Sequence, residues 1–269
     1  MKKTLARALT ALTVATALVA QTANVKQPKV KNNKEAEAVN AVFQAADDDA
    51  RIAAAENLLT KFHDTEFKAL AMYIAATAAQ NKNDFEKMVI YGERTLEADP
   101  KFYAVMLMLA TGYAQKTREF DFDKDEKLAK VDKWAKEGIE LVANAQKLQP
   151  QITDEQWTAI KKDFQAQGHE ALALAAQVRK KNDVAAAEFK LAIENQQKPD
   201  PATMARLGSL YNLMSKWDDA LAILDKANTV PDINPAVKQF VASERVKALM
   251  GKKKAETPAA PAAPAAPKP

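Results

Sequence analysis

Apolar side chains recur at intervals of three and four residues from about residue 35 to residue 251. That spacing places them on one side of an α-helix, and no stretch shows the sustained alternation that is typical of a strand. Polar breaks separate the apolar segments, and their Asp, Asn and Pro residues can end one helix and cap the next. The breaks lie at His63-Asp64, Asn81–Asp84, Asp99-Pro100, Lys180–Asp183, Asp200-Pro201 and Pro231-Asp232. The pattern predicts an all-α body.

Two helices can be placed more closely. Thr153 and Gln156 have the spacing of a capping box, in which each side chain bonds the backbone of the other residue. We therefore expect a long helix to start there and to run through Trp157 and Phe164 toward Val178. We expect the first helix of the body to span Glu35 to Ala46.

The chain also repeats itself. A shift of 35 residues places Leu172 on Leu207, Ala185 on Ala220 and Phe189 on Leu224, so that small residues fall on small ones and large on large. Two antiparallel helices that cross closely need this pattern, because a small residue on one helix admits a bulky residue of its neighbour. The repeat predicts successive helix pairs that pack against one another.

These positions resemble the tetratricopeptide repeat (TPR), a 34-residue helix pair. The best copy, Pro201 to Asn234, carries Leu207-Gly208, Tyr211, Ala220, Leu224, Ala227 and Pro231. Further copies span Ala69 to Phe102, begin near Tyr103, and span Ala166 to Pro199, with a degenerate copy upstream at Ala55, Leu59 and Phe62. The sequence departs from the signature at Met88, Gly92, Thr95 and Ala176, and the copy near Tyr103 contains an insert at Thr117 to Asp125.

The resemblance to exported bacterial TPR proteins implies a right-handed α-solenoid of about five antiparallel helix pairs over residues 35–251. It also implies a concave groove, lined by the first helix of each pair, that binds a peptide or helix of a partner protein. Mapped onto this chain, the groove positions are Tyr73, Thr77, Gln80, Asn81, Leu107, Thr111, Ala114, Gln115, Glu170, Leu174, Gln177, Ala205, Ser209, Asn212 and Leu213.

Both ends of the chain differ from the body. Lys2, Lys3 and Arg7 precede an apolar run and then small residues, which is the order of a secretory signal, so we predict a signal peptide over residues 1–23 and a linker over 24–34. The run is shorter than the ~20 residues of a membrane-spanning helix, which favours cleavage over a stable span. Residues 252–269 repeat Pro and Ala, which predicts a disordered, polyproline-like tail. The expected location is the periplasm or the exterior of the cell.

Composition narrows the possible chemistry. The chain has no cysteine, 2 histidines and 6 glycines, which excludes thiol chemistry and argues against glycine-rich phosphate loops. The net charge of +4 comes from the two ends, so the body offers no basic stripe for nucleic acid.

Histidines and carboxylates are the remaining candidates for chemistry. His63 and His169 lack a recognisable nucleophile and orienting group, so we expect structural roles. We interpret Asp47 to Asp49 as the negative N-terminus of a helix. The insert carries Asp121, Asp123, Asp125 and Glu126 with calcium-like spacing, but Glu126 stands where the sharp turn needs glycine and Asp132 where a longer glutamate is usual. We expect Phe120 and Phe122 to make this a packed loop, and we predict no metal site and no cofactor.

The sequence thus favours a non-enzymatic scaffold of the cell envelope that binds other proteins. Aromatic residues such as Tyr73, Phe85, Trp134, Trp157 and Trp217 are interpreted as core. The alternatives are a small-molecule or glycan-binding module, or a hydrolase that uses carboxylates. Paired acids facing one pocket would favour these alternatives. The partner's identity does not follow from the sequence.

Overall fold

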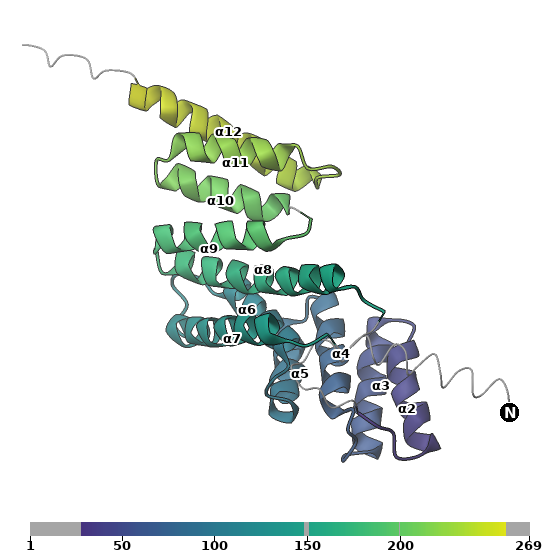
Figure 1. Cartoon of the computed structure of the whole chain (residues 1–269). Coiled ribbons are helices and arrows are strands. Elements are labelled where there is room, and N and C mark those ends of the chain that lie inside the picture. The colour runs from purple at the N-terminus through teal and green to yellow at the C-terminus, as the bar shows by residue number, and fades with distance from the viewer. Residues whose placement is uncertain (1–27, 148–150, 199, 257–269) are drawn as a thin grey trace, which may run out of the picture. The chain divides into compact units, whose positions relative to one another are not determined.

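The computed structural model describes residues 28–147, 151–198 and 200–256. Within these ranges every regular secondary-structure element is an α-helix, which confirms the all-α prediction (Figure 1). The chain divides into two compact units, one ending at Gln197 and the other beginning at Lys198. The predicted signal peptide and the part of the tail beyond Glu256 lie outside the described residues.

The first unit contains four helix pairs among its described residues. Short connections join most successive helices, so neighbours in sequence run antiparallel and pack side by side (Figure 1). The pairs are α2 (Asn33–Gln44) with α3 (Asp48–Lys61), α4 (Lys68–Asn81) with α5 (Phe85–Ala98), α6 (Tyr103–Lys116) with α7 (Lys124–Asn144), and α8 (Asp154–Val178) with α9 (Asn182–Asn195).

The second unit contains a fifth pair, α10 (Pro201–Leu213) and α11 (Trp217–Asn228), followed by a final helix, α12 (Pro235–Glu256). Both α10 and α11 pack against α12. Over the described part of the chain the structure therefore confirms the prediction of about five antiparallel helix pairs.

The helix boundaries follow from local chemistry. The side chain of Asp47 accepts a hydrogen bond from the N–H of Ala50 at 2.8 Å, as expected for the negative N-terminus of α3. Thr153 and Gln156 form the predicted capping box, with reciprocal bonds of 2.9 and 3.2 Å. Asp200 caps α10, whose first residue is a proline. The sequence placed these starts correctly because capping depends on only a few neighbouring residues.

The turn inside a pair recurs in three of the pairs described. Asn83, Lys180 and Ser215 have φ values of 57°, 60° and 57°, and each follows the first helix of its pair. In every case the next residue donates its N–H to a carbonyl five residues back, to Ala79, Ala176 and Tyr211. This left-handed C-terminal motif usually contains glycine, which the glycine-poor chain replaces with Asn, Lys and Ser.

Close contact of small and large side chains joins the helices of a pair. Gly208 of α10 faces Leu224 of α11, and a methyl group on Gly208 would lie 2.5 Å from Leu224 Cγ. Leu224 and the flanking Ala220 and Ala227 are buried. The packing expected from the repeat is confirmed here, since both residues come from the best TPR copy.

The helix α6 lies in the centre of the first unit. It is buried on almost every side, by α5 and α7 and also by α8, which crosses it. The Tyr103 and Phe164 rings meet edge to face with centroids 5.3 Å apart, and Trp157 of α8 donates its indole N–H to the carbonyl of Ala145. A helix that is apolar all round belongs in a core. None of the described helices combines the length and apolar character needed to cross a membrane.

Three boundaries differ from the sequence expectations. The first helix is α2, which starts at Asn33 and ends at Gln44, slightly earlier than the predicted span. The helix α12 continues through the three lysines Lys252 to Lys254 as far as Glu256, where a disordered tail was predicted. Lysine is a good helix former, so the helix continues up to the proline-rich segment.

We predict that Gly208→Ala destabilises the protein although alanine favours helix. The new methyl group would overlap Leu224, and overpacking of a core costs about 1–3 kcal/mol, whereas the gain in helix propensity is only about 1 kcal/mol. Chemical denaturation of the full chain measures the free energy of unfolding.

Gly112→Ala is the matched control. A methyl group on Gly112 would lie 2.6 Å from Cε at the flexible end of Met88, which can move aside, and 3.2 Å from Cε2 of the Phe85 ring, which would need to shift by only a few tenths of an ångström. The free energy of unfolding should then change by less than about 1 kcal/mol. Equal effects of the two substitutions would contradict the packing described for Gly208.

Candidate functional site

Two of the predicted groove residues lie in the interior. Leu107 is 0% exposed, and Asn212 is 9% exposed and hydrogen-bonded to α12. Neighbouring helices cover both positions, so neither side chain is open to a partner in this structure. Ala114 and Ala205 are buried in the same way.

Most of the other groove positions lie half-buried on the first helices of their pairs. Tyr73 stacks on Phe102 with ring centroids 4.9 Å apart, and the hydroxyl group of Thr77 donates to the carbonyl of Tyr73. The half-buried set also includes Thr111, Glu170, Leu174, Gln177 and Ser209, while Leu213 is exposed. Asn81 is exposed, and its amide donates to Asp48 of α3 at 3.3 Å. Ser209 and Leu213 belong to the second unit, and the other positions of this group belong to the first.

The structure brings two of the predicted residues together. Gln80 at the end of α4 and Gln115 at the end of α6 line one open hollow of about 80 Å³. Both side chains are exposed, and the buried Met88 lines the same hollow. The hollow is lined by Gln80, Asn83, Phe85, Met88, Gly112, Gln115 and Lys116. It combines an apolar floor with two amide groups that can both donate and accept hydrogen bonds.

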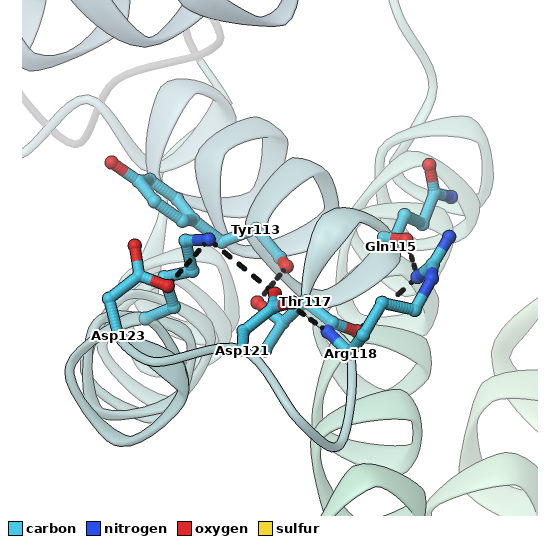
Figure 2. A network of polar contacts seen from close by, with 7 residues as sticks. Tyr113, Gln115, Thr117, Arg118, Asp121 and Asp123 are labelled. Carbon is cyan, nitrogen blue, oxygen red and sulfur yellow. Dashed lines mark hydrogen bonds and ion pairs between the residues drawn. The ribbon is translucent and has the colours of Figure 1, made fainter.

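A loop held by polar contacts starts directly beside this hollow. The Thr117 hydroxyl group donates to the carbonyl of Tyr113 at 2.7 Å, and the Arg118 side chain donates to the carbonyl of Gln115 at 2.6 Å (Figure 2). Asp121 accepts from the Arg118 N–H at 2.9 Å. The first and middle parts of the loop are thus tied to α6 and to each other.

Ion pairs hold the far side of the same loop. The Lys127 ammonium of α7 lies 2.8 Å from Asp123 and 3.5 Å from Asp121 (Figure 2). The hydrogen bond from the Arg118 N–H is the largest cause that holds the pKa of Asp121 below its usual value, and the nearby Lys127 adds to it. Glu119 pairs with Lys180 at 2.5 Å. Hydrogen bonds and ion pairs therefore fix the insert at its ends and in its middle.

The tip of this loop contradicts the sequence expectation. Phe120 is 91% exposed and Phe122 is fully exposed, so the loop is not packed through its aromatic residues. The polar groups hold the loop instead, which leaves both rings in solvent. A hydrophobic pattern in a sequence assigns aromatic residues to the core. It does not indicate that hydrogen bonds and ion pairs will fix the conformation of a loop.

Two of the residues considered for chemistry, His169 and Asp132, have structural partners. His169 Nδ1 lies 2.7 Å from a Glu188 carboxylate oxygen of α9, a pairing that the sequence did not suggest. Asp132 receives two hydrogen bonds from Arg179, at 3.0 and 2.9 Å, so its carboxylate is engaged away from the insert. His63 is exposed at the end of α3. Over the described ranges no group of three or more His, Asp or Glu side chains gathers as metal ligands would.

Asn212 instead anchors the last helix. Its amide donates to the backbone carbonyl of Glu244 at 2.8 Å and to the Glu244 carboxylate at 3.0 Å. Lys247 lies 2.5 Å from the other carboxylate oxygen, although the Glu244 side chain is only 2% exposed. Burial raises the pKa of Glu244, but the hydrogen bonds from Lys247 and Asn212 outweigh it and hold the pKa below its usual value.

Comparison with known proteins finds a similarity to solved structures. No protein-family model matches the chain, and no curated protein matches it. Among solved structures, the chain is similar to a thermophilic TPR protein from Thermus thermophilus. The two are 17% identical, the match covers 74% of this chain and 91% of the other, and the TM-score is 0.45.

The chain's own helix pairs pack in the way that the resemblance in its sequence implies. The small-on-large contact of Gly208 with Leu224 falls at the signature positions of the repeat. The left-handed turn recurs inside three pairs, and successive helices pack in sequence order within each unit. These features come from the geometry of the described residues, independently of any likeness to another protein.

We predict that Glu244 makes the docking of α12 sensitive to acid. The pKa of Glu244 is lower in the folded protein than in the unfolded chain. The ionised carboxylate therefore stabilises the folded state fully at pH values above the unfolded pKa. This stabilisation is lost as the pH falls through the folded pKa. The measurement is the thermal unfolding midpoint as a function of pH. Glu244→Gln should lose less stability than the native protein in the acidic range.

Glu256→Gln serves as the control, because Glu256 is exposed at the end of the same helix. Its pH profile should follow that of the native protein. If the Glu244→Gln profile also runs parallel to the native one, the buried carboxylate does not anchor α12 as described.

Proposed function

We propose that this protein is a non-enzymatic protein-interaction scaffold of the cell envelope or periplasm. The observation that carries the proposal is the hollow at α4, α5 and α6, which Gln80 and Gln115 line together with Phe85 and Met88. Exposed amides beside an apolar floor suit an extended peptide, whose backbone needs donors and acceptors and whose side chains need an apolar seat.

The size of the hollow favours a peptide over a metabolite. At about 80 Å³ it holds a single side chain, whereas pockets for small molecules usually measure about 300–1,000 Å³. The rest of a peptide would lie across the surface formed by the ends of α4 and α6. Lys116 on the rim adds a positive charge, which favours a segment with a carboxylate next to its apolar residue.

The location rests on the N-terminal sequence. Lys2, Lys3 and Arg7 before an apolar run support export, and the absence of cysteine is compatible with an oxidising compartment. The partner is then an envelope or periplasmic protein. The fold needs no reactive group for this role, since recognition by stacked helix pairs uses shape and hydrogen bonds.

We predict that the hollow contacts the partner in cells. A photo-reactive amino acid in place of Lys116 should form adducts with one or a few envelope proteins. Gln80→Ala combined with Gln115→Ala should lower the adduct yield by roughly 30-fold, because two hydrogen bonds of roughly 1 kcal/mol each are lost. Gel analysis of fractionated cells measures the yield and the compartment.

The matched control places the same photo-reactive group at Ile90, an exposed residue on α5 that does not line the hollow. Its adducts should differ and should not respond to the double substitution. Adducts from Lys116 that persist in the double variant would contradict binding at the hollow. Adducts confined to the cytosol, on protein that keeps Met1, would contradict the location.

A further inference from the structure

The last described helix, α12, exposes more large apolar side chains than any other described segment, the aromatic tip formed by Phe120 and Phe122 between α6 and α7 included. The outer stripe of α12 consists of Ala242, Val246, Leu249 and Met250. Their spacing of four, three and one residues puts them on one side of the helix. All four are exposed, Met250 by 68%. The helix therefore turns an apolar surface to solvent.

The opposite side of α12 is packed within its own unit. Val241, Glu244 and Ala248 are buried, and the helix contacts α10 and α11 (Figure 1). The Trp217 ring of α11 lies so close to Gly251 that a methyl group there would be 2.7 Å from it. The last helix of a stack usually turns a polar face to solvent, and an exposed apolar face marks a contact site. The outer stripe is such a face, held in a fixed position.

The sequence directly after α12 is suited to cover the outer stripe. Residues 257–267 read TPAAPAAPAAP and carry no charged side chain. Proline recurs at every third position, at Pro258, Pro261, Pro264 and Pro267. A polyproline II helix has three residues per turn, so in that conformation the prolines line one edge and the alanines line the other two. From Pro258 onward every edge of such a segment is apolar.

This composition also makes the segment easy to order on an apolar surface. The side chains of alanine and proline lose no rotamer entropy when they are buried. The proline ring fixes φ near the polyproline II value, so the backbone loses less freedom as well. Proline has no N–H, so at four positions of this segment no backbone donor is left unpaired against the helix.

The lengths of the segment and of the helix agree. From Glu256 back to Ala242 the axis of α12 measures about 21 Å. Proline is favoured at the second position of a β-turn, so Thr257 and Pro258 can start a reversal directly after the helix. After a turn at residues 257–260, residues 261–267 span about 22 Å as a polyproline II helix. The segment therefore reaches the far end of the outer stripe.

We propose that residues 261–267 fold back as a polyproline II helix and cover the outer stripe of α12 in the same molecule. Covalent attachment gives the segment an effective concentration in the millimolar range, so a second copy at micromolar concentration would have to bind the stripe about 1,000-fold more tightly to compete. The cover keeps the apolar face from binding other molecules. The hollow at Gln80 and Gln115 is not part of this contact.

A nitroxide spin label on the full chain tests the proposal by NMR. Because the sequence has no cysteine, Ala263→Cys supplies a single attachment site. The methionine methyl groups are labelled with carbon-13, and the signal that disappears in Met250→Leu is the signal of Met250. In the otherwise native protein this signal should lose most of its intensity to the nitroxide and regain it when the nitroxide is reduced.

Two sets of substitutions separate a docked segment from one that only hangs near the helix. Pro261→Gly, Pro264→Gly and Pro267→Gly together keep the length of the segment but make it flexible, so most of the Met250 signal should return. Val246→Gln with Leu249→Gln removes apolar contact from the outer stripe and should have the same effect. Loss of the Met250 signal that is equal in the native protein and in both variants would overturn the proposal.

A mixing experiment tests whether the contact lies within one molecule. Spin-labelled protein without carbon-13 is mixed with carbon-13 protein that carries no nitroxide. The Met250 signal of the second protein should keep its intensity at all concentrations. Loss of that signal on mixing would show that another copy covers the stripe, and it would overturn the intramolecular contact.

Two controls secure the interpretation. Ile90→Gln removes a comparably exposed apolar side chain from α5 and should leave the loss of the Met250 signal unchanged. Circular dichroism should show the native content of α-helix in the stripe variant, since Val246 and Leu249 are exposed. None of these results bears on peptide binding at the hollow, which the Lys116 adducts test separately.

Discussion

The structure depends on one kind of contact, in which a large side chain of one helix fills the space left by a glycine on its neighbour. Leu107 of α6 is the central example in the first unit. A methyl group on Gly138 of α7 would lie 2.8 Å from its Cδ2 atom, and one on Gly168 of α8 would lie 3.0 Å from it. One leucine therefore joins three helices from two successive pairs. Within the first unit this contact couples the third pair to the fourth, so neither of these pairs buries all of its apolar residues alone.

This packing also decides where recognition can occur. The helix α6 is so fully enclosed that a groove along it cannot be open at Leu107, and α8 occupies the space that a ligand would need. What remains open lies at the ends of the helices, where Gln80 and Gln115 border the hollow and the polar network supports the aromatic tip. The proposed binding surface accordingly lies at the ends of the central helices and not along their sides.

The sequence was sufficient to predict the features that depend on neighbouring residues or on the repeat. Helix starts such as Thr153 follow from capping, and the contact of Gly208 with Leu224 follows from the repeat. The burial of the groove positions Leu107 and Asn212 did not follow from the sequence, because exposure depends on which later helix covers a position. The burial of Leu107 could have been predicted from the composition of α6, because a helix that is apolar on all sides is buried on all sides. The exposure of Phe120 had no such signal, because it depends on side-chain contacts between residues of the loop and of α7.

Hydrogen exchange of the backbone amides in the native protein and in Leu107→Ala tests the central claim most directly. If Leu107 couples successive pairs, its loss should increase exchange in α6, α7 and α8 together, by roughly 30-fold or more, as expected for a large-to-small change in a core. Increased exchange confined to α6, with α7 and α8 protected as before, would show that the pairs hold their structure independently and would contradict the account.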